Sequence, residues 1–174
     1  MARLLRRRGY AASGLKEIVA DSGAPKGSLY FHFPGGKEQL AVAAIDHSGE
    51  QLRGAIAAVR AGTKGGPRRT LAALIDALAA GLESSGYRDG CPIATVALET
   101  AAESDAVRAA ADGAFSSWLA ELEAMFRESG MSRAGSRRRA LHALAAIEGA
   151  LILARARRDP EPLHAVRSEL LAMD

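Results

Sequence analysis

The residues that could do chemistry gather near the N-terminus, in the segment GAPKGSLYFHFPGGK over residues 23–37. Pro25 can open a short helix there, because a first helical turn does not need the amide hydrogen that proline lacks. Backbone amides, a cation and small side chains at the start of a short helix suit phosphates and base edges in the major groove of DNA. The side chains expected to face DNA are those of Lys26, Gly27, Ser28, Tyr30 and His32.

Two neighbouring helices must hold this short helix in place. A helix over residues 14–22, capped by Ser13 or by the glycine after it, precedes it across a tight turn. The apolar side chains of that helix are expected to pack on Leu29. Lys37 begins the next helix, where its charge and the unpaired amides of the terminus can hold a phosphate. The pattern predicts a helix-turn-helix.

Charge is distributed unevenly along the 174 residues. Residues 1–37 carry seven Arg and Lys side chains against two carboxylates, a net charge of +5, so the rest of the chain carries −2 of the total +3. Phosphate neutralisation supplies most sequence-independent affinity for DNA. A basic head on a slightly acidic body therefore indicates that the head meets a polyanion, although a charge run by itself also marks a solvated helix face.

The remainder of the chain predicts helices alone. Hydrophobic residues make up 48% of the chain and charged residues 25%, a balance typical of a folded protein. Helical periodicity is expected over residues 1–8, 37–62, 68–83, 92–102, 105–130, 132–158 and from 159 to the end. We expect an all-α fold with two domains, a three-helix helix-turn-helix (homeodomain-like) domain over residues 1–44 and a helical-bundle ligand-binding and dimerisation domain over residues 45–174.

The N-terminal segment strongly resembles the TetR/AcrR family of repressors. The family's DNA-binding domain shows a Gly-Tyr pair, a small hydroxyl residue, an Ile-Ala-like pair, a glycine turn, a Gly-Ser-Leu-Tyr-x-His-Phe run and a Lys-Glu-x-Leu. The matching residues here are Gly9 and Tyr10, Ser13, Ile18 and Val19, Gly23, Gly27 to Phe33, and Lys37 to Leu40. The form FPGGKEQL and the segment GCPIATVALETA are similar to the LmrA/YxaF-like subgroup. The first helix is shorter than the family's, so either the chain starts late or a shortened helix serves.

The resemblance implies further site residues. Ser13 and Lys37 would contact phosphates, and the helices of the body would enclose a small hydrophobic or aromatic inducer. Aromatic residues of the long helix after residue 105 are core by default, but in such a family one of them is equally suited to a cavity wall. The residues expected to bind ligand are Cys91, Glu99, Phe115, Trp118, Leu122 and His142, although the first is a small core residue by default and the two polar ones are more often exposed.

The last two helices carry more apolar surface than one chain covers, which predicts a homodimer through a four-helix interface. The residues expected at that interface are Leu144, Ile147, Leu151, Leu163, Val166 and Leu170. A dimer of helix-turn-helix heads reads a palindromic operator, and an inducer that favours another head separation would release it.

Other function classes find less support. The sequence shows no nucleophile with a base at motif spacing, no paired catalytic carboxylates and no cluster of metal ligands, so neither an enzyme nor a bound cofactor or metal is expected. No apolar stretch is long enough for a transmembrane helix and no secretory signal is evident, so a cytoplasmic protein without a membrane partner is expected. The open alternative is a helical small-molecule-binding or scaffold protein whose DNA-binding head is no longer functional.

Overall fold

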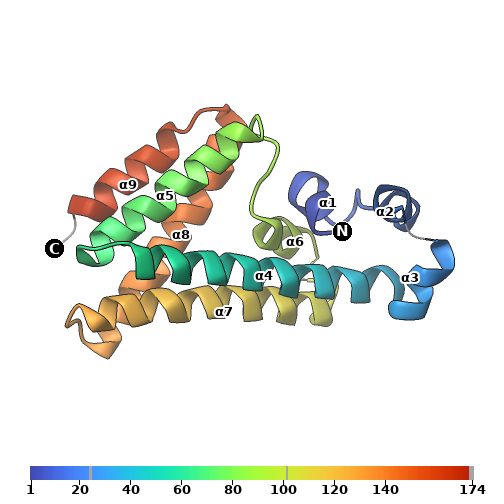
Figure 1. Cartoon of the computed structure of the whole chain (residues 1–174), viewed down its shortest axis with the longest axis horizontal. Coiled ribbons are helices and arrows are strands. Elements are labelled where there is room, and N and C mark those ends of the chain that lie inside the picture. The colour runs from blue at the N-terminus through green and yellow to red at the C-terminus, as the bar shows by residue number, and fades with distance from the viewer. Residues whose placement is uncertain (24, 101, 173–174) are drawn as a thin grey trace. The chain divides into compact units, whose positions relative to one another are not determined.

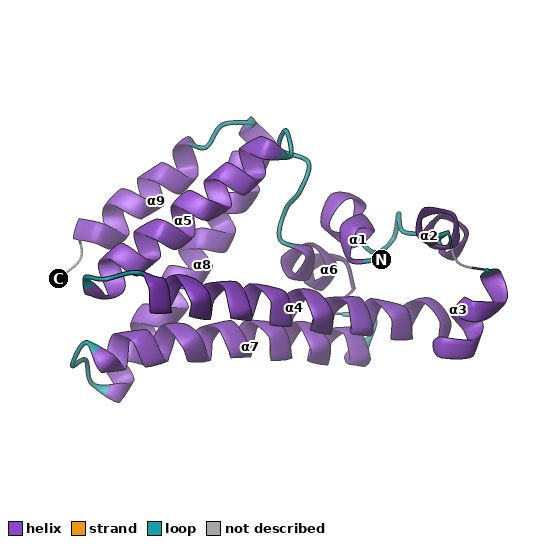
Figure 2. Cartoon of the chain, viewed as in Figure 1, coloured by secondary structure: helices purple, strands orange, loops and turns teal. Residues whose placement is uncertain are grey.

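The computed structural model describes residues 1–23, 25–100 and 102–172, and every regular element in these ranges is a helix (Figure 2). The helices are α1 (Ala2–Arg8), α2 (Leu15–Ser22), α3 (Lys26–His32), α4 (Gly36–Gly62), α5 (Gly66–Ser84), α6 (Pro92–Thr100), α7 (Asp105–Glu128), α8 (Arg133–Arg157) and α9 (Glu161–Ala172). This confirms the predicted all-α fold. Among the described helices, none is both long enough and apolar enough to span a bilayer.

The chain forms two compact units. Unit 1 comprises Met1–Gln51 together with Cys91–Phe115, and unit 2 comprises Leu52–Gly90 together with Ser116–Asp174. The long helices α4 and α7 therefore each contribute their first part to unit 1 and their second part to unit 2. Unit 1 thus contains α6 and the start of α7 in addition to the first three helices.

A small apolar core holds the first three helices together. Leu4 of α1, Ile18 of α2 and Leu29 of α3 are buried against one another. The partly buried apolar side chains packed around them are those of Met1, Leu15, Val19 and Leu40. Leu29 has the core position expected from the sequence, and its burial fixes which side of α3 faces inward.

Local signals set most helix ends where the sequence places them. Gly23 ends α2 in the left-handed conformation, at φ 66°, and the Ser132 hydroxyl caps α8 by accepting from the amide of Gly135 at 3.2 Å. The cap of α7 differs from the expectation. The hydroxyl of Ser104 accepts from the amide of Val107 at 3.1 Å, so the capping residue precedes Asp105.

Unit 2 is a bundle in which α5, α8 and α9 lie side by side (Figure 1). Its interior contains aliphatic and aromatic side chains from α5, α7, α8 and α9, among them Ile75, Trp118, Ile147 and Leu163. Where α4 and α7 run together in this unit, Glu121 accepts from Arg53 and from Arg60, each at 3.0 Å. The bundle agrees with the predicted helical C-terminal body.

Candidate nucleic-acid interface

The outer side of α3 carries most of the side chains predicted to face DNA. Leu29 is buried beneath the helix, whereas Tyr30, at 48% exposed, and His32 are both turned to solvent. Gly27 is exposed at the first turn, and Ser28 is partly buried beside it. The side chain of Lys26 lies outside the described residues. The structure therefore brings Gly27, Tyr30 and His32 to solvent on one short helix.

The glycine of this helix has no role in the fold that the structure reveals. A Cβ atom on Gly27 would meet no other atom of the chain within 4 Å, and its backbone is helical. The fold itself would accept a side chain here. Absence of a side chain at the first turn instead leaves room for the close approach of another molecule, as contact with a DNA backbone requires.

Sequence reasoning missed one residue of α3. Phe31 is 81% exposed, which is more than any other large hydrophobic side chain in the part of the chain that the structure describes. Its ring packs edge-to-face on the ring of His32, with 5.1 Å between centroids and 88° between planes. The signal was available: Phe31 stands two positions from Leu29, which puts it on the opposite side of the helix from that core residue.

Ser13 is not placed as predicted. Its side chain is fully buried, and its hydroxyl donates to the carbonyl of Gly9 at 2.6 Å. The N-cap of α2 is Gly14, with no side-chain capping bond. The predicted phosphate contact of Ser13 is therefore wrong for this conformation, since a buried hydroxyl cannot reach DNA. A small hydroxyl residue is needed here to tie the loop between α1 and α2 to the end of α1.

The replacement Ser13→Ala tests this correction. We expect it to lower the free energy of unfolding by about 1–2 kcal/mol, because the Gly9 carbonyl loses its buried partner. Thermal unfolding followed by circular dichroism measures that loss. A plot of the logarithm of the DNA association constant against the logarithm of salt concentration is expected to keep its slope, whereas loss of a phosphate contact would reduce the magnitude of that slope by about 0.9.

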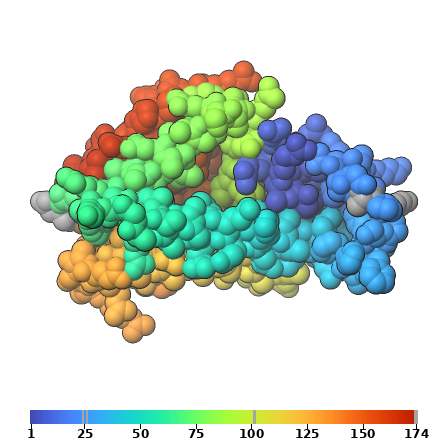
Figure 3. Space-filling model, in the orientation of Figure 1, coloured from blue at the N-terminus to red at the C-terminus, as the bar shows by residue number. Residues whose placement is uncertain are grey.

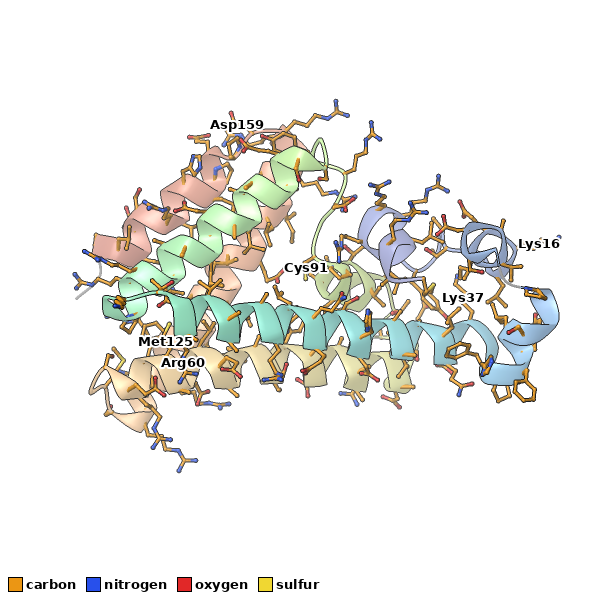
Figure 4. The ribbon with its side chains drawn as sticks, in the orientation of Figure 1. Lys16, Lys37, Arg60, Cys91, Met125 and Asp159 are labelled. Atoms are coloured by element: carbon orange, nitrogen blue, oxygen red, sulfur yellow. The ribbon has the colours of Figure 1, made fainter. Side chains whose placement is uncertain are left out.

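Lys37 contacts the protein itself. It lies at the start of α4, beside the loop between α1 and α2 (Figure 4). Its ammonium group stands 4.2 Å from the centre of the Tyr10 ring and donates to the carbonyl of Ala11 at 3.4 Å. Burial, together with the nearby carboxylate of Glu38, raises the pKa of Tyr10, so this phenol is neutral at neutral pH. The phosphate contact of Lys37 remains a prediction; its contacts within unit 1 are established by the geometry.

The two carboxylates of residues 1–37 are both engaged by arginines of α1. Arg3 pairs with Asp21, and Arg8 pairs with Glu17. Both pairs join α1 to α2 at the surface, where an ion pair contributes little to stability because solvent screens it. Their consequence is electrostatic: the negative charges of the head are matched locally, and its net charge stays positive.

The residues predicted to bind ligand divide between the units. Unit 1 contains Cys91 and Phe115, both partly buried, together with Glu99; unit 2 contains Trp118, Leu122 and His142. Trp118 and Leu122 are 1% and 2% exposed, which suits a core or a cavity wall equally.

Two of these six have surroundings that differ from the prediction. Glu99 is exposed, and its carboxylate accepts from the amides of Tyr10 and Ala11, so it faces the N-terminal helices and not a ligand in the body. His142 is also exposed, beside Arg138 and Arg139 in an open depression at the start of α8. Sequence spacing identified both as polar residues beside apolar stretches but could not say which element they face.

Most residues predicted at a dimer interface are buried within the chain itself. Ile147, Leu151, Leu163 and Leu170 are at most 8% exposed, and Leu144 and Val166 are partly buried. The four buried residues are thus corrected to core positions. The apolar side chains that α8 exposes are instead Leu141, Ile152 and Leu153, at 44%, 52% and 56%.

Comparisons with known proteins agree with this geometry. Residues 2–44 match the model of the bacterial regulatory proteins of the tetR family, and residues 67–169 match that of the C-terminal domain of LmrA/YxaF-like transcriptional regulators. The chain is 35% identical over 162 residues to the HTH-type transcriptional regulator LmrA of Bacillus subtilis, which covers 92% of this chain and 85% of the relative.

Two further comparisons extend over nearly the whole chain. An uncharacterized HTH-type transcriptional regulator of Mycobacterium tuberculosis is 37% identical over 174 residues, with 97% of this chain and 87% of the relative covered. Among solved structures, the regulatory protein TetR from Rhodobacter sphaeroides has a TM-score of 0.88 at 24% identity, covering 97% of this chain and 92% of that one. The latter likeness shows the fold, and the family models and relatives confirm the resemblance seen in the sequence.

Proposed function

Because this chain belongs to the TetR family of bacterial regulatory proteins, with an LmrA/YxaF-like C-terminal domain, we propose that it is a ligand-responsive repressor that binds a palindromic operator as a homodimer. In this proposal residues 1–44 read double-stranded DNA, and residues 45–174 bind a small hydrophobic or aromatic inducer and form the dimer. The protein acts in the cytoplasm, where its DNA is.

The observation that carries the proposal is the solvent side of α3. A helix of seven residues presents Gly27, Tyr30, Phe31 and His32 outward while Leu29 anchors it to α1 and α2. A helix this short fits the major groove, where aromatic and hydrogen-bonding tips contact bases and sugars. The buried Leu4–Ile18–Leu29 core supports a functional DNA-binding domain and argues against the alternative in which this domain is no longer functional.

The exposed apolar side chains of α8 support the dimer. Leu141 and Ile152 are eleven positions apart, about three helical turns, so they share one face of α8. Ala145 and Gly149 lie between them on that face, and small residues allow two helices to approach closely. Pairing this face with its copy would bury side chains that water now contacts, as a two-fold symmetric interface does.

Selection from a random pool of duplexes tests the proposal as a whole. The purified full chain is expected to enrich one palindromic motif at modest ionic strength, and mobility shift of that duplex confirms the enrichment. Sedimentation in the absence of DNA is expected to give a dimer. Failure to enrich any motif would contradict the proposal and favour a helical ligand-binding or scaffold protein.

A panel of planar aromatic compounds then tests the response to ligand. A compound that binds one conformation of the body better than the other must shift the equilibrium between them. An inducer is therefore expected both to raise Tm in the absence of DNA and to weaken binding of the selected duplex. A compound that raises Tm while leaving affinity for the duplex unchanged is a ligand but no inducer.

A further inference from the structure

A carboxylate far along the sequence holds the loop between α1 and α2. Glu99, on α6, accepts from the amide of Tyr10 at 2.6 Å and from the amide of Ala11 at 2.9 Å. All three residues belong to unit 1. Two successive backbone amides that donate to one carboxylate form a charge-assisted pair of hydrogen bonds, stronger than bonds between neutral groups.

Gly9 leaves room for the carboxylate at these amides. A Cβ atom on Gly9 would clash with the carboxylate of Glu99 in its present position. Gly9 also has a φ of 77°, a conformation that other residues rarely adopt. Close approach and backbone conformation therefore select glycine for two separate reasons, and the first of them exists only because Glu99 is there.

The ammonium group of Lys37 contacts the same loop through its ring and carbonyl groups. The Lys37 ammonium contacts the Tyr10 ring and the Ala11 carbonyl, while Glu99 takes the amides of the same two residues. The packing of α1 directly on α6 supports this arrangement (Figure 3). Opposite charges from α4 and α6 thus fix one short segment of backbone.

This segment leads directly into the helix-turn-helix. The loop leads from α1 into α2, and Ser13 ties its far end to Gly9 through a buried hydrogen bond. Since α3 packs on α1 and α2 through one small core, we expect a shift of the loop to move the outer side of α3 as well. We propose that Glu99 is a positioning residue for DNA binding, which holds the helix-turn-helix in one orientation on α6. The inference rests on the proposed function.

Electrostatics alone predicts the opposite effect of removing Glu99, which makes the test decisive. A negative charge on a basic head repels phosphates, so its loss would by itself tighten DNA binding. Loss of positioning weakens binding, because the head must then be ordered when DNA binds. Glu103 is a matched control, since it is exposed, lies in unit 1 close to Glu99 in sequence and carries the same charge.

The experiment compares Glu99→Ala, Glu99→Gln and Glu103→Ala with the unmodified chain, using the duplex that the unmodified chain selects. We expect Glu99→Ala to bind that duplex about fivefold more weakly or worse, Glu99→Gln to recover part of the loss through its remaining carbonyl oxygen, and Glu103→Ala to bind equally or more tightly. Equal or tighter binding by Glu99→Ala would overturn the proposal.

Amide hydrogen exchange gives a readout that does not depend on DNA. The amides of Tyr10 and Ala11 are expected to exchange much faster in Glu99→Ala than in the unmodified chain or in Glu103→Ala. Unchanged exchange would refute the contact. If the unmodified chain selects no duplex, the proposed function fails, and the positioning role in DNA binding falls with it, while exchange still decides whether Glu99 holds the loop.

A double-mutant cycle with Gly9→Ala tests the geometry directly. Alanine at position 9 keeps its backbone strain in either background, but its clash with Oε1 exists only when Glu99 is present. The loss of Tm caused by Gly9→Ala should therefore be smaller in the Glu99→Ala background. Additive losses would show that the carboxylate does not lie against Gly9, and would overturn the proposal.

Discussion

Replacing Ile152 by glutamate is expected to convert the dimer into a monomer and to weaken operator binding by roughly 100-fold or more. Ile152 is 52% exposed and lies on the apolar face that α8 presents to solvent, towards the C-terminal end of the helix. A pair of glutamates placed opposite one another across a two-fold axis would be desolvated without a partner. Because a dimer gains affinity by joining two half-site contacts, a monomer loses that gain.

Sedimentation and mobility shift on the selected duplex measure these two effects. Ala80→Glu is the matched control, since Ala80 is exposed on α5 and the same charge is introduced in the same unit. This control is expected to remain dimeric and to bind normally. A dimeric Ile152→Glu variant would show that the face of α8 around Ile152 is not the interface.

The neighbouring position separates dimerisation from folding. Leu151 is only 8% exposed, so Leu151→Glu places a charge inside the bundle of unit 2. The expected cost there is about 4 kcal/mol or more in the free energy of unfolding, seen as a large fall in Tm. Ile152→Glu is expected to keep its helical circular dichroism. The same substitution at two adjacent positions of α8 should thus disrupt folding in one variant and dimerisation in the other.

Replacing Tyr30 by alanine is the second change with a large expected effect. Tyr30 is half exposed on the outer side of α3, so its loss should change the free energy of unfolding by no more than about 0.5 kcal/mol. Affinity for the selected duplex is expected to fall roughly 10-fold to 100-fold, the range associated with one specific base contact. Loss of dimerisation is not expected.

The salt dependence of binding distinguishes a base contact from a phosphate contact. Tyr30→Ala should leave the slope of affinity against salt unchanged, whereas Lys26→Ala should reduce it by about 1. Leu98→Ala is the control, because Leu98 is an exposed apolar residue of α6 in the same unit. Normal affinity in both Tyr30→Ala and Lys26→Ala would refute the assignment of α3 as the recognition helix.

Features that depend on neighbours in the sequence could be predicted well. The end of α2 at Gly23, the start of α3 after Pro25 and the buried position of Leu29 follow from a glycine, a proline and helical spacing. The exposed face of α3 could be predicted for the same reason, although Phe31 was overlooked. These interactions act within a few residues, so the local sequence contains the physical information that fixes them.

Predictions that depend on which other elements cover a helix were less accurate. On α8 apolar residues occur on more than one side, and periodicity shows that Leu141 and Ile152 share a face without showing that this face is exposed. For Ser13, a hydroxyl before a helix suggested a cap or a phosphate contact, yet its direction was set by the carbonyl of Gly9. Burial belongs to the assembled bundle, and one helix does not contain it.

The sequence by itself determined an all-helical chain with a basic N-terminal helix-turn-helix, because helix ends, turns and periodicity are encoded by adjacent residues. Only the tertiary structure decided that Glu99 holds the amide of Tyr10, 89 positions away, and that Leu151 is core while Ile152 meets solvent. A hydrogen bond or a buried face between distant segments exists only once the chain has folded, so no local pattern specifies it.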